Sequence, residues 1–211
     1  MSLLLRKLVS GMPKIVDKSL QRKEIAEAAL EGFIEQGVNR FSLSAFLKKH
    51  SIPKGRFYHY FASKDALLFE SVQLLADQYL SRFNEEVDWH QDLVGKLIVA
   101  HEFYLEACPD HQKKQQFVFD VSTHFTRHES LDIQQFNREL YQSIFEIVKS
   151  IIEDEISKKR IKPESIGLIP SIVATTDGLL MQSLIMQEVD LRQSLLDYFK
   201  SLQQVLSVIK S

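Results

Sequence analysis

Apolar residues recur every three to four positions along most of the chain, which is the spacing of one face of an α-helix. In the first such segment Ile25, Ala29 and Phe33 lie four residues apart. Gly37 follows where that pattern stops, and glycine is the residue that most often ends a helix. The pattern therefore predicts a helix that ends near Gly37.

Two serines are placed to cap further helices, because each precedes a stretch of helical periodicity. Ser42 precedes a short helix that reaches Leu47, and Ser63 precedes a longer one. The longer helix carries the apolar positions Leu68, Val72, Leu75, Tyr79 and Phe83. The same periodicity predicts helices over residues 92–107, 111–126, 130–158, 164–187 and 190–209.

No run of alternating apolar and polar residues bounded by hairpin turns occurs along the chain. Only seven Gly and five Pro interrupt its 211 residues. We therefore predict an all-α protein of about nine helices.

Charge is distributed unevenly along the chain. Residues 1–64 contain 12 of the 26 Lys and Arg but only 5 of the 28 Asp and Glu, a net charge of +7. Residues 65–211 have a net charge of −9, which brings the whole chain to −2. A basic module joined to an acidic one suggests that the first part binds a polyanion and the second has another role.

Cys108 is the only cysteine, so the chain has no internal disulfide and is expected in the cytoplasm. No run of about 18 uncharged apolar residues is present, which argues against a membrane span. Residues 1–18 are expected to form a partly disordered N-terminal extension, and Met12 is an alternative start to Met1.

The stretch from Leu43 to Leu67 has the pattern of a helix-turn-helix, in which one helix supports a second that enters the major groove of DNA. Pro53 fixes φ at the start of the second helix. Lys54 and Arg56 share that short helix with aromatic residues, of which Phe57 is expected to face inward, as is Phe61 beyond it. The side chains expected to contact DNA are Ser42, Ser44, Lys54, Gly55, Arg56, Tyr58, His59, Tyr60 and Lys64.

Residues 19–67 resemble the DNA-binding domain of the tetracycline-repressor (TetR) family of bacterial transcription regulators. The matching elements are the helix Ile25 to Gly37, then Ser42-Leu43, then Ile52-x-Lys54-Gly55-x-Phe57-Tyr58-x-Tyr60-Phe61-x-Ser63-Lys64-x-x-Leu67. The resemblance implies that Tyr58 and Lys64 hold phosphates and that Lys54, Gly55 and Arg56 face the groove. The chain departs from the family pattern in the turn, where Ser51 replaces the usual Gly and Pro53 replaces Ser or Thr.

The same resemblance implies a three-helix DNA-binding domain at residues 19–79 and a helical effector-binding and dimerisation domain at residues 80–211. It further implies a homodimeric repressor that binds a palindromic operator and is released by a small-molecule effector. The expected dimer interface consists of Ile166, Ile169, Val173, Leu180, Leu184, Leu195, Phe199, Leu202 and Leu206.

Family layout also places an effector pocket among the aromatic residues of the second domain. Its expected lining is Phe103, Tyr104, Phe117, Asp120, His124, Phe136, Tyr141 and Met181. The sequence names neither the effector nor the operator. A regulator that requires a corepressor, or an activator of the same fold, would have the same DNA chemistry.

One alternative belongs to another functional class. Asp120, His124 and His128 are spaced four residues apart on one predicted helix, and histidines four apart can bind a metal together with a carboxylate. A metal-dependent helical enzyme is therefore the second interpretation. However, the chain has no phosphate-binding Gly-rich loop, nucleophile elbow or complete catalytic motif. We predict a regulator with no cofactor and no metal rather than an enzyme.

Overall fold

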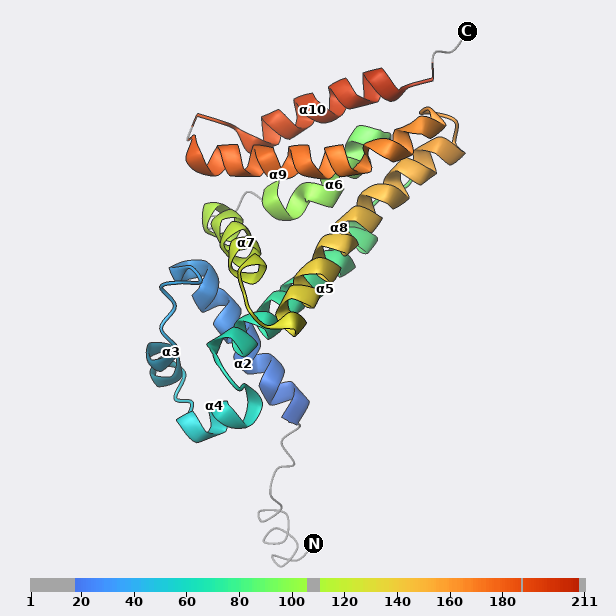
Figure 1. Ribbon diagram of the computed structural model, residues 1–211. Helices are drawn as coiled ribbons and strands as arrows, with labels where there is room; N and C mark the ends of the chain where they lie inside the picture. Colours follow the sequence, from blue (N-terminus) through green and yellow to red (C-terminus); the bar gives the residue numbers. More distant parts are fainter. Residues whose placement is uncertain (1–17, 106–110, 187, 209–211) are drawn as a thin grey trace, which may run out of the picture.

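The computed structural model describes residues 18–105, 111–186 and 188–208, apart from the side chains of Lys18, Phe103, Tyr104 and His111. The expected N-terminal extension, Met12 and Cys108 lie outside the described residues. Within these ranges the chain forms nine α-helices, one 3-10 helix and no strand, so the all-α prediction is confirmed. In the labels of Figure 1 the elements are α2 (Lys18–Gln36), α3 (Leu43–Lys49), α4 (Lys54–Tyr60), α5 (Lys64–Glu86), α6 (Leu93–Leu105), α7 (His111–Thr126), α8 (Leu131–Ser157), η2 (Pro163–Leu168), α9 (Ile169–Ile185) and α10 (Leu191–Leu206).

The predicted helix boundaries in the first third of the chain are confirmed by local hydrogen bonds. The Ser42 hydroxyl accepts from the backbone N–H of Ala45 at 3.4 Å, and that of Ser63 accepts from Ala66 at 3.0 Å. Gly37 follows α2 with a φ of +79°, a left-handed conformation that glycine adopts without a steric penalty. These three residues mark the end of α2 and the starts of α3 and α5.

The segment predicted as one helix over residues 164–187 is divided in the structure. A 3-10 turn, Pro163–Leu168, precedes α9, which begins at Ile169. Pro163 and Pro170 each stand in the first turn of their element, where the missing N–H has no partner to lose. The prolines thus mark two helix starts where the apolar periodicity indicated one.

The helices form an elongated molecule with the two shortest helices, α3 and α4, at one end (Figure 1). The long helices α5 and α8 lead away from that end. At the opposite end α9 and α10 lie side by side and pack on α6 and α8 (Figure 1). Helix α7 lies between the two ends, in contact with α2 on one side and with α8 and α9 on the other.

Two hydrophobic cores occupy the two ends. The first, which we call the head core, contains the buried apolar side chains of α2, α3, α4 and the first part of α5, and we call this part of the molecule the head. The second, which we call the bundle core, contains those of α6, α9, α10 and the later part of α8, together with Phe83 of α5, and we call this part the bundle. Phe117, Val121 and Phe125 of α7 belong to the head core although they lie far along the chain from α2. A movement of α7 would therefore change the packing of the head core.

Candidate nucleic-acid interface

The turn between α3 and α4 is closed by backbone hydrogen bonds. The N–H of Ser51 donates to Lys48 O at 3.2 Å, and the N–H of Ile52 donates to Leu47 O at 2.9 Å. Ser51 has a φ of +54°, the left-handed conformation that suits the glycine usually found in the family at this position. The turn therefore has the same shape with serine, but the left-handed backbone of Ser51 is less favourable than that of a glycine would be.

Aromatic side chains anchor α4 to the rest of the head. Phe57 is 0% exposed and Phe61 is 1% exposed, as expected from their spacing. Phe46 and Leu47 of α3 are buried in the same core, and Ile52 packs against it from the turn. Because both helices are fixed on their inner side, the outer face of α4 has a defined position.

The outer face of α4 presents the side chains that the sequence predicted to contact DNA. Lys54, Arg56 and His59 are exposed, and Tyr58 is 58% exposed. Gly55 lies between the two cations, and a Cβ added there would have no heavy atom within 4 Å. No neighbouring helix thus requires a glycine at this position, which leaves room for an external partner to approach the backbone.

Tyr60 has an internal role in the structure. Its hydroxyl donates to Gln21 Oε1 at 2.7 Å, and its backbone carbonyl accepts from Arg22 at 3.2 Å. Arg22 also pairs with Glu70 at 2.7 Å, and this hydrogen bond raises the pKa of its guanidinium. Sequence reasoning missed this support because its members come from α2, α4 and α5.

Lys64 and Ser42, two predicted DNA contacts, already have partners within the chain. The Lys64 ammonium donates to Val38 O at 2.7 Å and lies 5.8 Å from the centroid of the Phe41 ring. Its side chain is half-buried, and burial lowers its pKa. Ser42 caps α3, whereas Ser44 is exposed beside it. Lys64 therefore fastens the loop before α3 to the start of α5.

A cavity of about 320 Å³ lies between α5, α7, α8 and α9. Of the predicted effector-pocket residues it is lined by Phe117, Tyr141 and Met181. The sequence did not identify Asp177, whose carboxylate accepts a hydrogen bond from the Tyr141 hydroxyl. Burial raises the pKa of Asp177, and the bond from Tyr141 partly offsets that rise. Asp177 is the only charged residue of α9, which is the signal that could have marked it.

The other predicted pocket residues lie elsewhere. Asp120 borders a larger, more polar cleft of about 670 Å³ beside Gly37, and it accepts a hydrogen bond from Gln116 at 2.9 Å. His124 pairs with Asp65 at 3.1 Å. Phe136 packs on Phe69 with ring centroids 4.3 Å apart. The side chains of Phe103 and Tyr104 lie outside the described residues.

Most residues predicted for the dimer interface are buried within the protomer. These are Ile169, Val173, Leu180, Leu195, Phe199 and Leu206, all in the bundle core, with Leu184 and Leu202 half-buried beside them. Only Ile166 is exposed, at 41%. An apolar stripe shows that a helix face is covered, but intrachain packing and a partner chain give the same pattern.

Other apolar side chains of this end are open to solvent. Ile185 is 68% exposed and Val205 is 70% exposed, and Met181 and Met186 are also exposed. Residues 163–185 form the one described segment long and apolar enough to cross a membrane by length and composition, and 28% of its most apolar window is buried in the protomer. Ser171 and Ala174 on α9 are exposed as well, so another helix could approach this face closely.

Comparison with known proteins agrees with the family resemblance of the N-terminal residues. Residues 25–71 match the model of the bacterial regulatory proteins of the tetR family. Over 176 residues the chain is 23% identical to the HTH-type transcriptional regulator PksA of Bacillus subtilis, a match covering 82% of this chain and 83% of that protein. Over 67 residues it is 36% identical to the HTH-type transcriptional regulator UidR of Escherichia coli K12, covering 32% of this chain and 34% of UidR.

Solved structures share the fold over nearly the whole chain. A transcriptional regulator from Saccharomonospora viridis, crystallised in complex with choline, superposes with a TM-score of 0.77 at 16% identity, covering 92% of this chain and all (100%) of that one. A TetR transcription regulator from Haloarcula marismortui gives a TM-score of 0.74 at 13% identity, covering 90% and 100%. At these identities the structures establish the arrangement of helices.

Proposed function

We propose that this chain, which belongs to the tetR family of DNA-binding transcriptional regulators, acts as a homodimeric repressor released from a palindromic operator by a small-molecule effector. Family membership establishes the DNA-binding regulator. The repressor role, the dimer and the release by an effector are our proposal. As a repressor of transcription it would work in the cytoplasm.

The outer face of α4 is the observation that carries the proposal. Lys54 and Arg56 are exposed on a helix whose inner side is fixed by the buried Phe57. The described contacts give neither cation a partner within the chain, so both remain available to an external anion. A helix of this kind can enter the major groove, where a guanidinium reads guanine through two hydrogen bonds. Tyr58 and His59 beside them can contact phosphates.

The DNA-binding part is tested by measuring affinity for random-sequence duplex DNA at several salt concentrations by fluorescence anisotropy. The double variant Lys54→Ala/Arg56→Ala should bind more weakly, and the slope of log K against log salt should fall by about 1 for each lost phosphate contact. The control is Lys162→Ala/Lys200→Ala, which removes two exposed charges from the bundle end. Equal losses in both variants would show that α4 is not the binding surface.

The dimer would form through the exposed apolar face at the α9–α10 end. Ile185, Val205 and their exposed neighbours would be covered by the same face of a second copy, as twofold symmetry requires. We expect Ile185→Asp/Val205→Asp to sediment as a monomer, while Leu131→Asp, at a 78% exposed leucine on α8, stays dimeric. A monomeric wild-type protein at micromolar concentration would contradict this part.

The effector would occupy the 320 Å³ cavity, whose walls are mainly apolar and whose charged lining residue is Asp177, paired with Tyr141. This lining suits a small apolar molecule with one cationic or hydrogen-bond-donating group. A thermal-shift screen should find ligands of this type, and Asp177→Asn should weaken their binding while leaving binding of DNA unchanged. Ligands that bind Asp177→Asn and wild type equally would place the effector elsewhere.

A further inference from the structure

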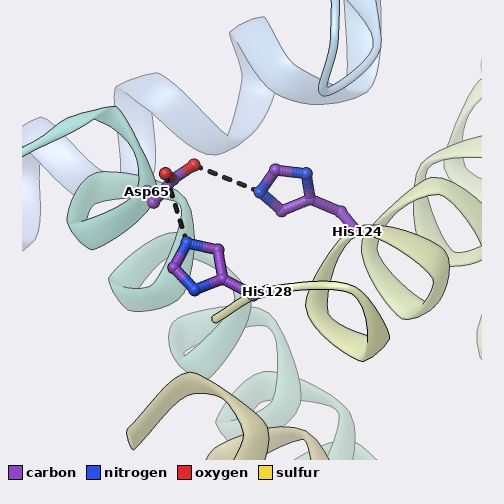
Figure 2. A group of neighbouring side chains, drawn as sticks. All are labelled: Asp65, His124 and His128. Carbon is purple, nitrogen blue, oxygen red and sulfur yellow. Dashed lines mark hydrogen bonds and ion pairs between the residues drawn. The ribbon is translucent and has the colours of Figure 1, made fainter. Parts of the chain in front are cut away.

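Three side chains with metal-binding atoms meet where the head joins α7 (Figure 2). Asp65 comes from the first turn of α5, His124 from the last turn of α7, and His128 from the turn after it. His124 Nε2 lies 3.1 Å from Asp65 Oδ1, and His128 Nε2 lies 3.4 Å from Asp65 Oδ2. Both rings therefore point at one carboxylate that is about 60 residues away in sequence.

The carboxylate in this group differs from the one that the sequence suggested. Asp120 was expected to join His124 and His128, but its carboxylate is bonded to Gln116. The helical spacing of four residues placed Asp120 and the histidines on one face, whereas the side chain that approaches the imidazoles comes from another helix. Among the described residues, the carboxylate that approaches His124 and His128 is therefore that of Asp65.

The spacing of the three donors suits a tetrahedral ion. Zinc binds imidazole nitrogen and carboxylate oxygen at about 2.0–2.2 Å, which separates neighbouring ligand atoms by about 3.3 Å. Each imidazole meets its own carboxylate oxygen, His124 at 3.1 Å from Oδ1 and His128 at 3.4 Å from Oδ2. One ligand atom from each of the three residues lies within 4.8 Å of the other two. Two imidazoles and one carboxylate suit Zn²⁺ or Co²⁺, whereas Mg²⁺ prefers oxygen ligands.

We propose that Asp65, His124 and His128 form a binding site for a divalent transition-metal ion of the zinc type, and that the ion ties α7 to the DNA-binding head. Three protein ligands leave the fourth position for water or another donor. The site is 22–37% exposed at its side chains, so an ion can reach it from solvent. Its role is regulatory, and no catalysis is implied.

One ligand links the ion to the turn between α7 and α8. The backbone N–H of Ser130 donates to His128 Nδ1 at 3.0 Å, so the neutral ring carries its proton on Nε2. When a metal binds Nε2, the proton moves to Nδ1, and the Ser130 N–H must find another partner. Metal binding would therefore rearrange the residues that lead into α8 as well as fix α7 against α5.

The position of the site gives the ion a route to DNA binding. Asp65 follows Lys64, which fastens the loop before α3, and α7 lines the proposed effector cavity through Phe117 and Val121. An ion at Asp65 would thus bias the position of α7 relative to the head. This effect on DNA rests on the proposed function, whereas binding of the ion does not.

The proposal is tested on the full chain, free of metal and of any polyhistidine tag. Isothermal titration with Zn²⁺ should show one strong site per chain, and Co²⁺ should give the visible absorption of a tetrahedral complex. Mg²⁺ should give neither. Asp65→Asn, His124→Gln and His128→Gln should each weaken Zn²⁺ binding by at least about tenfold, since each removes a direct ligand and loss of supporting groups alone costs that much.

Matched controls separate this site from other histidines and carboxylates. Asp120→Asn and His90→Gln, the latter at an exposed histidine beyond α5, should bind Zn²⁺ like wild type. Circular dichroism of each variant without metal would verify folding. Absence of a strong Zn²⁺ site, or retention of it in the two ligand-histidine variants, would overturn the proposal. DNA binding measured in parallel distinguishes this failure from failure of the proposed function.

Discussion

In the bundle the side chain of Lys96 is completely buried, whereas the basic side chains of α3 and α4 are all exposed. The Lys96 ammonium bonds Asp154 and the buried Glu155. Burial alone would lower the pKa of Lys96, but these hydrogen bonds raise it above its ordinary value. The head core, by contrast, includes no Lys, Arg, Asp or Glu among its buried described residues.

The contrast shows two uses of charge in one chain. A buried cation must be neutralised by groups of its own protein, so it contributes to folding and is closed to a ligand. An exposed cation contributes little to folding and remains available to a phosphate or a base. Substitutions in the bundle should thus change stability, and those on the outer face of the head should change binding.

The largest expected effect is that of Lys96→Ala. Removing the ammonium leaves Glu155 buried, with Arg160 at 3.1 Å as its remaining charged partner among the described residues. We expect the free energy of unfolding to fall by about 3–5 kcal/mol, measured by urea denaturation. Lys200→Ala, at an exposed lysine of α10, should change it by less than about 0.5 kcal/mol. Similar losses of unfolding free energy in the two variants would contradict a stabilising role for the buried Lys96.

Arg56→Ala should change DNA binding and leave stability nearly unchanged, the opposite of Lys96→Ala. Its side chain is exposed and lies outside the head core, so stability should remain within about 0.5 kcal/mol of wild type. Preference for the best base pair at one operator position should fall by about 1–3 kcal/mol, measured by competition between duplexes. Unchanged preference would mean that Arg56 does not read a base.

Lys64→Ala tests a cation that both stabilises the fold and was predicted to contact DNA. Loss of its bond to Val38 O should reduce stability by about 1 kcal/mol, and the loosened loop should weaken binding to all duplexes alike. Both quantities can be measured on one preparation, by denaturation and by anisotropy. A loss of DNA affinity with full stability would instead assign Lys64 to direct contact with phosphate.

The smallest expected effect concerns Ser51 and Lys159, the two non-glycine residues with positive φ in the part of the chain that the structure describes, one at each end of the molecule. Ser51 lies in the turn before α4 at +54°, and Lys159 follows α8 at +55°. Ser51→Gly and Lys159→Gly should each stabilise the protein by up to about 1 kcal/mol, because glycine avoids the left-handed penalty. Thermal denaturation gives the measurement, and a loss of stability in either variant would show that its side chain makes a compensating contact.

Local features of the fold could be predicted from the sequence, and long-range ones could not. The caps at Ser42 and Ser63 and the inward positions of Phe57 and Phe61 depend on spacing along one helix, so the pattern reveals them. The partner of Lys64 is a backbone carbonyl 26 residues earlier, which no periodicity indicates. The pairing of Asp65 with two histidines likewise depends on how α5 and α7 pack.

The apolar stripes of α9 and α10 show a different limit. They predicted correctly that these faces are covered, but Leu195 and Phe199 are covered by the bundle itself. Apolar spacing predicts that a helix face is buried, but it does not indicate which helix or chain covers that face. Exposed residues such as Ile185 and Val205, which were identified only from the structure, are the ones that the proposed dimer would cover.

Selection of bound sequences from random duplex DNA with the purified wild-type protein tests the central claim most directly. Our account predicts an enriched palindrome whose two half-sites have centres about one helical turn, or a multiple of it, apart, because two α4 helices of a symmetric dimer enter grooves on the same side of the duplex. Enrichment of no sequence would contradict the regulator that we describe, and enrichment of a single unrepeated site would contradict the symmetric dimer.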